Sequence, residues 1–131
     1  MSNLKKKDAY SVSVATASAE AFFREVAKHK RVWAIRDTAG FPTATSSGKT
    51  AMPFWSSRAR AESVIANVPD YKKFEPVELP LETFRDRWLP GLERDGLQVG
   101  LNWSGERALG YDYSPADVLA RIQEELTKHD A

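Results

Sequence analysis

Two short segments carry hydroxyl, guanidinium and amide side chains that could bind an anion. The first, Trp55-Ser56-Ser57-Arg58, follows an apolar run and opens a predicted helix. Free amides at a helix start can hold an anion, and an arginine beside them would strengthen the contact. The second, Asn102-Trp103, ends the most regular predicted strand, where polar groups beside an aromatic ring often line a cleft. The candidate ligand-binding residues are therefore Trp55, Ser56, Ser57, Arg58, Asn102 and Trp103.

Each segment also has a purely structural interpretation. Trp55 can belong to the core while Ser56 or Ser57 caps the following helix. Asn102-Trp103 can lead into an ordinary loop. The two segments form one cleft only if their strands are neighbours, so the sequence leaves both interpretations open.

Ser47-Gly48-Lys49-Thr50 matches the end of a phosphate-binding loop. That motif needs a glycine where this chain has Thr43, and it needs a helix where Pro53 lies in an extended apolar segment. A hairpin turn explains these residues better.

The inventory of reactive side chains names no catalytic residue. The chain has no cysteine, which excludes a disulfide, a thiolate nucleophile and a cysteine-based zinc site. Its two histidines, His29 and His129, have no metal-ligand spacing, and no Gly-x-Ser-x-Gly motif occurs. We expect no metal and no cofactor.

Length and composition indicate one folded unit. A chain of 131 residues with 42% hydrophobic and 28% charged residues can bury one core. We expect a single globular domain over residues 1–131, with residues 1–8 flexible. The net charge of +1 argues against a nucleic-acid-binding face, although Lys5–Lys7 form a small basic segment. No run of about 18 apolar residues is present, so we expect no membrane partner and a cytoplasmic location.

Hydrophobic periodicity predicts helices over 17–30, 56–67, 81–89 and 115–126. Strands are predicted over 31–36, 41–45, 50–55, 74–79, 97–103 and 108–113, the first three as a β-meander. The clearest strand alternates Leu97, Val99, Leu101 and Trp103 with polar or small residues. The resulting fold class is α+β: one mixed, largely antiparallel sheet of five or six strands with three to four helices packed on it.

Four segments carry a resemblance to a known family: Val32–Asp37, Pro53–Ser57, Trp88–Leu92 and Val99–Trp103. With them the chain resembles the bacterial domain-of-unknown-function family numbered 2750, from about Phe22 to Leu126. The resemblance implies a single-domain bacterial protein. It implies no substrate, cofactor or catalytic residue.

The function that we expect is a non-enzymatic binding or interaction domain, such as an adaptor or an immunity-type protein that masks another protein. The alternative is a small-molecule or anion binder, or an enzyme, that uses a cleft near Trp55–Arg58 and Asn102–Trp103. A homodimer built on an aromatic patch remains open.

Overall fold

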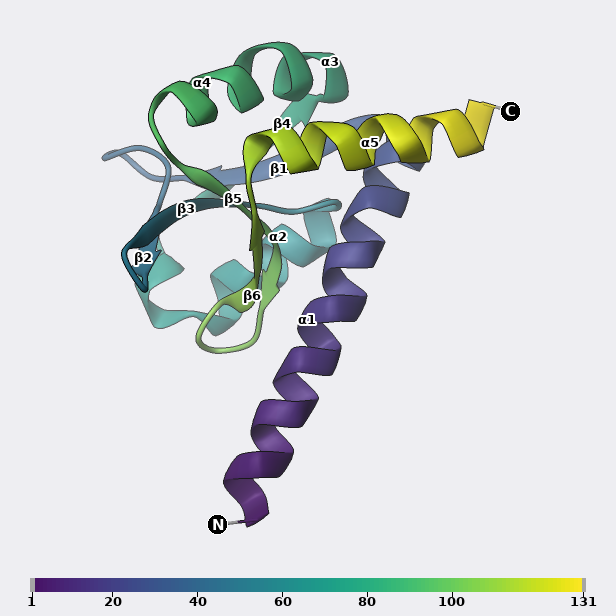
Figure 1. The fold of residues 1–131 in the computed structure, drawn as a ribbon. Coiled ribbons are helices and arrows are strands. Elements are labelled where there is room, and N and C mark those ends of the chain that lie inside the picture. The colour runs from purple at the N-terminus through teal and green to yellow at the C-terminus, as the bar shows by residue number, and fades with distance from the viewer. Residues whose placement is uncertain (1, 131) are drawn as a thin grey trace.

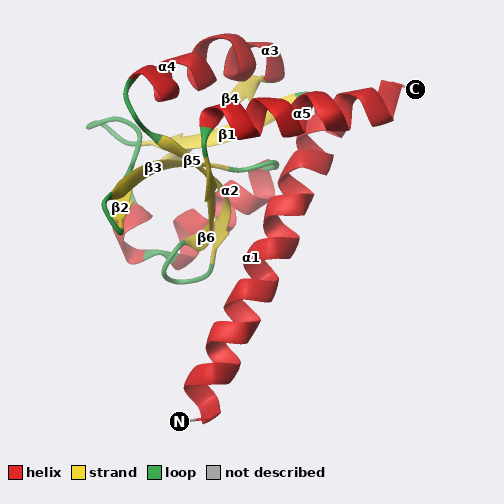
Figure 2. Ribbon diagram, viewed as in Figure 1, coloured by secondary structure: helices red, strands yellow, loops and turns green. Residues whose placement is uncertain are grey.

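The computed structural model describes residues 2–130, and the side chains of residues 13–128. Its elements confirm the α+β class and the six strands (Figures 1 and 2). The helices are α1 (Ser2–His29), α2 (Arg58–Asn67), α3 (Leu81–Thr83), α4 (Leu89–Arg94) and α5 (Pro115–Asp130). The strands are β1 (Arg31–Arg36), β2 (Ala44–Ser46), β3 (Lys49–Phe54), β4 (Glu75–Pro80), β5 (Gln98–Ser104) and β6 (Leu109–Tyr113).

Helix α1 begins at Ser2, much earlier than the predicted start at residue 17. Its second half carries Phe22, Phe23 and Val26, which are fully buried and pack on the sheet and on α5. The first half extends past the strands (Figure 1). The predicted flexibility of residues 1–8 stays a prediction, since their side chains lie outside the described part.

The strands form two sheets where one was predicted. One sheet pairs β1 with β4, and the other has the order β2-β3-β5-β6. Trp33 and Trp55 join the sheets through two backbone hydrogen bonds of 2.7 Å. The predicted meander is wrong in its first step, because β1 pairs antiparallel with β4 rather than with β2, whereas the antiparallel pairing of β2 with β3 is confirmed. A strand's hydrophobic pattern fixes its buried face but not its partner, which is set by contacts far apart in sequence.

The four-stranded sheet is built from two hairpins around a parallel pair. β3 and β5 run parallel, and β2 and β6 flank them in antiparallel pairing. Ser47 and Gly48 have φ of 52° and 78°, the left-handed pair that a tight two-residue hairpin turn requires. This confirms the hairpin turn at the segment that resembled a phosphate-binding loop.

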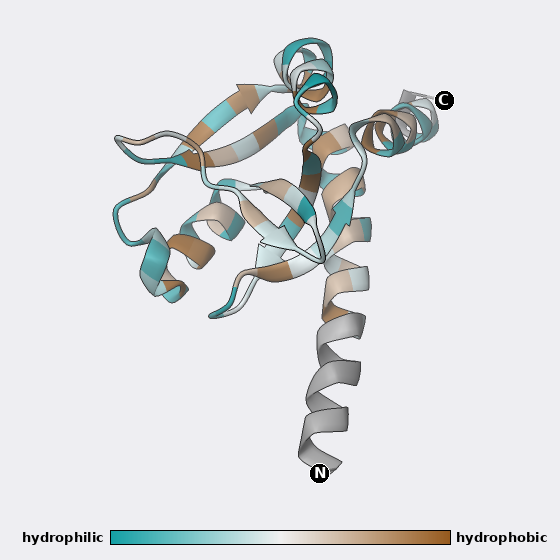
Figure 3. Ribbon diagram, turned by 60° about the vertical axis from the view of Figure 1, so that its left-hand side comes forward, coloured by the Kyte–Doolittle hydropathy of each residue, from teal (hydrophilic) through white to brown (hydrophobic). Residues whose placement is uncertain are grey.

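Two hydrophobic clusters lie on opposite faces of the strands. Val32 and Ala34 of β1 face the larger cluster under α1, α5 and the α3–α4 segment. Trp33 and Ile35 face the smaller cluster, which α2 covers. Hydrophobic and hydrophilic residues accordingly alternate around α2 and α5 (Figure 3). Strand β1 is thus buried on both sides, which explains its nearly unbroken apolar sequence.

The predicted helix over 81–89 continues through Pro90 to Arg94. A π-helical turn, Phe84–Trp88, joins α3 to α4, and the Leu89 amide donates to the carbonyl of Phe84. Proline clashes with the carbonyl four residues before it, and a widened turn just ahead of the ring relieves that clash. Gly96, with φ of 72°, ends the segment in the left-handed conformation that glycine adopts without strain.

Candidate functional site

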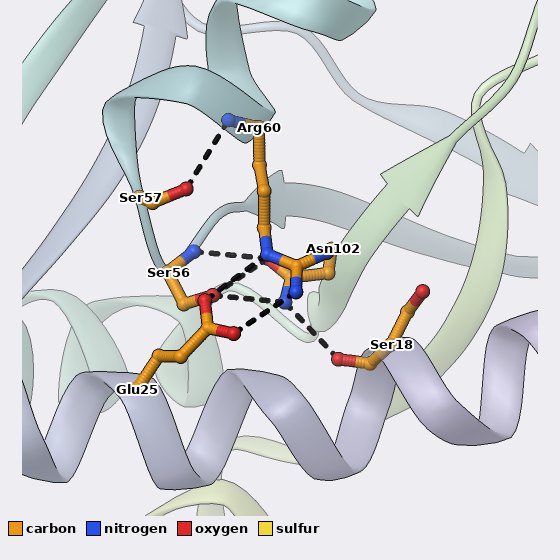
Figure 4. Close-up of polar contacts among 6 residues, drawn as sticks. All are labelled: Ser18, Glu25, Ser56, Ser57, Arg60 and Asn102. Atoms are coloured by element: carbon orange, nitrogen blue, oxygen red, sulfur yellow. Dashed lines mark hydrogen bonds and ion pairs between the residues drawn. The ribbon is translucent and has the colours of Figure 1, made fainter.

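Six polar residues meet where α1, the start of α2 and the end of β5 come together (Figure 4). We call them the polar cluster: Ser18, Glu25, Ser56, Ser57, Arg60 and Asn102. Three of them, Ser56, Ser57 and Asn102, belong to the candidate residues that the sequence indicated. The parallel pairing of β3 with β5 places the ends of these two strands side by side.

Two adjacent serines, Ser56 and Ser57, directly precede α2 and have different roles. Ser57 caps the helix, because its Oγ accepts from the amide of Arg60 at 3.2 Å. Ser56 is 1% exposed, and its own amide donates to Asn102 Oδ1 at 2.9 Å. The capping interpretation is therefore confirmed for Ser57.

Asn102 is the centre of the polar cluster. It is 1% exposed and has φ of 50°, a left-handed conformation that asparagine tolerates better than most residues. Its Nδ2 donates to the carbonyl of Ser18 at 3.0 Å and to Ser56 Oγ at 2.9 Å. Its side-chain amide therefore ties β5 both to α1 and to the start of α2.

The left-handed residue lies in a β-bulge, where the pairing of β5 with β6 shifts between Leu101 and Ser104. Val99 and Leu101 face the larger cluster, whereas Trp103 joins the smaller one. The alternation in the sequence therefore does not place Trp103 on the face of Val99 and Leu101, because the extra residue of a bulge reverses the side that follows it.

The Trp103 ring lies over two glycines on the reversed face. A Cβ added at Gly100 would lie 2.3 Å from the ring, and one at Gly110 would lie 2.6 Å from it. The indole nitrogen donates to Asp112 Oδ1 at 2.9 Å. The ring position therefore depends on the absence of side chains at both glycines.

Glu25 and Arg60 form the charged part of the polar cluster. Arg60 Nε donates to Glu25 Oε1 at 3.1 Å, and Arg60 Nη2 donates to Oε2 at 2.9 Å. Ser56 Oγ donates to Oε1 at 2.8 Å. The hydrogen bonds from Arg60, followed by the one from Ser56, lower the pKa of Glu25, although partial burial opposes them. The carboxylate is therefore ionised near neutral pH.

A pocket of about 240 Å³ adjoins the polar cluster, and we call it the α2 pocket. It lies between one face of α2 and the end of β5, close to the cleft that the sequence suggested. Arg60 and Asn102 reach it from the polar cluster. Its lining residues are Ala59, Arg60, Ser63, Val64, Asn102, Trp103 and Ser104.

Trp55 and Arg58 lie outside the α2 pocket lining. Trp55 is fully buried, and its indole nitrogen donates to the carbonyl of Trp103 at 2.8 Å. Arg58 is exposed, pairs with Glu62 at 3.3 Å and stacks on the Trp33 ring at 5.6 Å. Arg60 has the place that the sequence suggested for Arg58, because helix positions two apart point in different directions.

Sequence reasoning missed Glu25 as a site residue. A signal was present, because Glu25 follows Phe22 by three positions and precedes the buried Val26. A carboxylate at the border of a buried helix face requires a polar partner. The residue that serves as this polar partner is set by the tertiary structure and cannot be found from the sequence near Glu25.

The polar cluster has a hydroxyl next to a carboxylate but lacks the conditions for nucleophilic chemistry. Ser56 Oγ lies 2.8 Å from Glu25 Oε1, within reach of a general base. The lowered pKa of Glu25 makes it a poor proton acceptor near neutral pH, and Ser56 is almost completely buried. Among the described side chains, residues 13–128, no group of three or more His, Asp or Glu is placed to hold a metal ion.

Fold and site together define a small α+β domain with a hydrogen-bonded polar cluster beside an open pocket. The family described as "Protein of unknown function (DUF2750)" matches residues 19–122, so the chain belongs to that family. No curated protein matches the sequence. Of the helices in the described part, none is both long and apolar enough to cross a membrane.

Proposed function

We propose that this protein is a non-enzymatic binding domain that recognises another protein, as an adaptor or an immunity-type protein does. The observation that carries the proposal is the internal use of the polar cluster. Ser56, Glu25 and Asn102 bond to one another and to neighbouring elements, so they stabilise the fold. Chemistry on a substrate would require the Ser56 hydroxyl to be accessible to that substrate, and Ser56 is 1% exposed.

The surface of β6 supports a role in recognition. Leu109 is 54% exposed and Tyr111 is 39% exposed, and both lie on this outer strand of the four-stranded sheet. Exposed apolar side chains on an edge strand are typical of a contact surface. A second copy of the chain could use the same surface, which size-exclusion chromatography with light scattering would detect.

Ser56→Ala tests the non-enzymatic part of the proposal. The substitution removes the hydroxyl that Glu25 and Asn102 share, so we expect lower stability and unchanged partner capture from native lysate. A catalytic serine would give the opposite pattern: a measurable turnover by wild type that disappears in a Ser56→Ala protein that is still folded.

A second candidate function is binding of a small molecule or anion, and the α2 pocket is the observation that favours it. A thermal-shift screen with small anions, nucleotides, sugars and amino acids tests this candidate. A ligand at about a hundred times its dissociation constant stabilises the folded state by roughly 2.7 kcal/mol. If no compound shifts the melting temperature, protein binding is the candidate function that remains.

We propose a bacterial, cytoplasmic setting for this function, with no role for nucleic acid. The absence of cysteine supports a fold that does not depend on an oxidising compartment. The near-neutral charge supports a protein or small-molecule partner over nucleic acid. As a control, we expect the protein not to bind a nonspecific DNA duplex at any salt concentration.

A further inference from the structure

Arg60 is the charged residue that lines the α2 pocket, while its partner Glu25 does not line it. The other lining residues are neutral: two serines, an asparagine, a tryptophan and two apolar residues. Asn102 already uses its amide for Ser18 and Ser56. A ligand in the α2 pocket therefore meets one positive charge and no negative charge on the pocket wall.

The guanidinium of Arg60 has donors left over. Glu25 takes Nε and Nη2, one edge of the planar group. A guanidinium carries five N–H donors, so three remain: two on Nη1 and one on Nη2. These form a second edge with the fork geometry that matches a carboxylate.

Glu25 also fixes the position of this arginine. Two hydrogen bonds hold one edge of the guanidinium, and Ser56 Oγ donates to the carboxylate in turn. A donor fork that is already ordered loses less entropy when a ligand binds. Because Glu25 neutralises part of its charge, the site suits a singly charged anion better than a doubly charged one.

We propose that the α2 pocket binds a carboxylate group through the outer edge of Arg60, with the hydroxyls of Ser63 and Ser104 as further donors. The inference rests on the proposed binding function and names the chemistry of what is bound. The carboxylate can belong to a small free acid or to an acidic side chain of a partner protein. A pocket of about 240 Å³ admits a group of either kind.

Titration of the isotope-labelled full chain with small acids tests the inference by NMR. Acetate, propionate and N-acetylglutamate are compared with acetamide, propionamide and N-acetylglutamine at constant ionic strength. We expect saturable shifts at Arg60, Ser63 and Ser104 with the acids and none with the neutral amides. Equal shifts with the amides, or no shifts at these residues, would overturn the inference.

Glu25→Gln is the decisive variant, because it removes the negative charge beside Arg60 and keeps one side-chain oxygen that can still accept from the guanidinium. If Arg60 binds the carboxylate, Glu25→Gln binds acids several-fold more tightly even though it is less stable. Arg60→Lys binds them at least tenfold more weakly, because lysine lacks the planar fork. Unchanged affinity in both variants would contradict the assignment to Arg60.

Two further comparisons distinguish a small free acid from an acidic side chain of a partner protein, and distinguish failure of carboxylate binding from failure of the proposed function. An acidic peptide that binds more tightly than the free acids indicates a partner side chain, whereas the reverse order indicates a small acid. Either order supports carboxylate binding. If wild type captures a protein partner but binds no carboxylate in any form, the inference fails while the proposed function stands.

Discussion

Ser56 and Asn102, 46 positions apart in the chain, exchange hydrogen bonds in both directions. The Ser56 amide donates to Asn102 Oδ1 at 2.9 Å, and Asn102 Nδ2 donates to Ser56 Oγ at 2.9 Å. This pair locks the start of α2 to the end of β5. Asn102 also donates to the Ser18 carbonyl of α1, so one buried side chain connects α1, α2 and β5.

Replacing Asn102 with alanine tests that arrangement. The change leaves the Ser56 amide and the Ser18 carbonyl without their partner in a buried site, so we expect a loss of about 2–4 kcal/mol in unfolding free energy. Asn102→Gly should be less harmful by roughly 1 kcal/mol, because glycine adopts the left-handed backbone without strain. Urea denaturation measures both, and equal stability of all three proteins would contradict a structural role.

Glu25→Gln should reduce stability in a pH-dependent way. The pKa of Glu25 is below its ordinary value of 4.5, so its ionised form stabilises the fold above that pH. This contribution is lost as the pH falls through the folded-state pKa. We expect the variant to be about 1–2 kcal/mol less stable at pH 7 and the difference to shrink in acid.

Glu62→Gln provides the matched control. Its ion pair with Arg58 is exposed on both sides, so we expect a change below about 1 kcal/mol. Thermal and urea unfolding at several pH values compare the two variants. A Glu62→Gln loss as large as that of Glu25→Gln would remove the distinction between the polar cluster and an ordinary surface pair.

Asp112→Asn should have the opposite pH dependence. Desolvation raises the pKa of Asp112, although the hydrogen bond from Trp103 lowers it in part. The protonated form of Asp112 therefore stabilises the folded state of the wild type in acid. This contribution is lost, and the stability falls, as the pH rises through the folded-state pKa. The asparagine variant lacks this fall while keeping an acceptor for the indole. We expect its stability relative to wild type to increase from pH 3 to pH 7, and a decrease would be inconsistent with a raised pKa.

Gly100→Ala and Gly110→Ala should each displace the Trp103 ring. The added Cβ would lie at 2.3 Å and 2.6 Å from ring atoms, closer than real side chains approach. We expect losses of about 1–3 kcal/mol with a changed tryptophan fluorescence spectrum. Gly91→Ala is the control, because its Cβ would meet only Arg94 at 3.5 Å. Unchanged fluorescence in both test variants would place the ring elsewhere.

Local features of the fold could be predicted from the sequence because neighbouring residues determine them. Ser57 caps α2, Ser114 caps α5 through the amide of Asp117 at 3.1 Å, and Gly96 ends α4. Each depends on a contact within one or two turns of the chain. The hairpin turn at Ser47-Gly48 belongs to the same group.

Long-range features could not be predicted in the same way. The pairing of β1 with β4 and the parallel pairing of β3 with β5 join segments whose hydrophobic patterns fit several partners. The bulge at Asn102 places Trp103 on the face opposite to the one that alternation predicts. For the site, the sequence indicated Ser56 and Asn102, but the pairing of Glu25 with Arg60 joins α1 to α2 across 35 positions and depends on the tertiary fold.

Partner capture with a surface variant tests the central claim most directly. Wild type and the double variant Leu109→Ser/Tyr111→Ser are compared as baits in native lysate, after thermal unfolding shows equal stability. We expect that wild type enriches a specific protein and that the double variant does not. Equal capture by both baits, or no capture together with a turnover that Ser56→Ala abolishes, would contradict it.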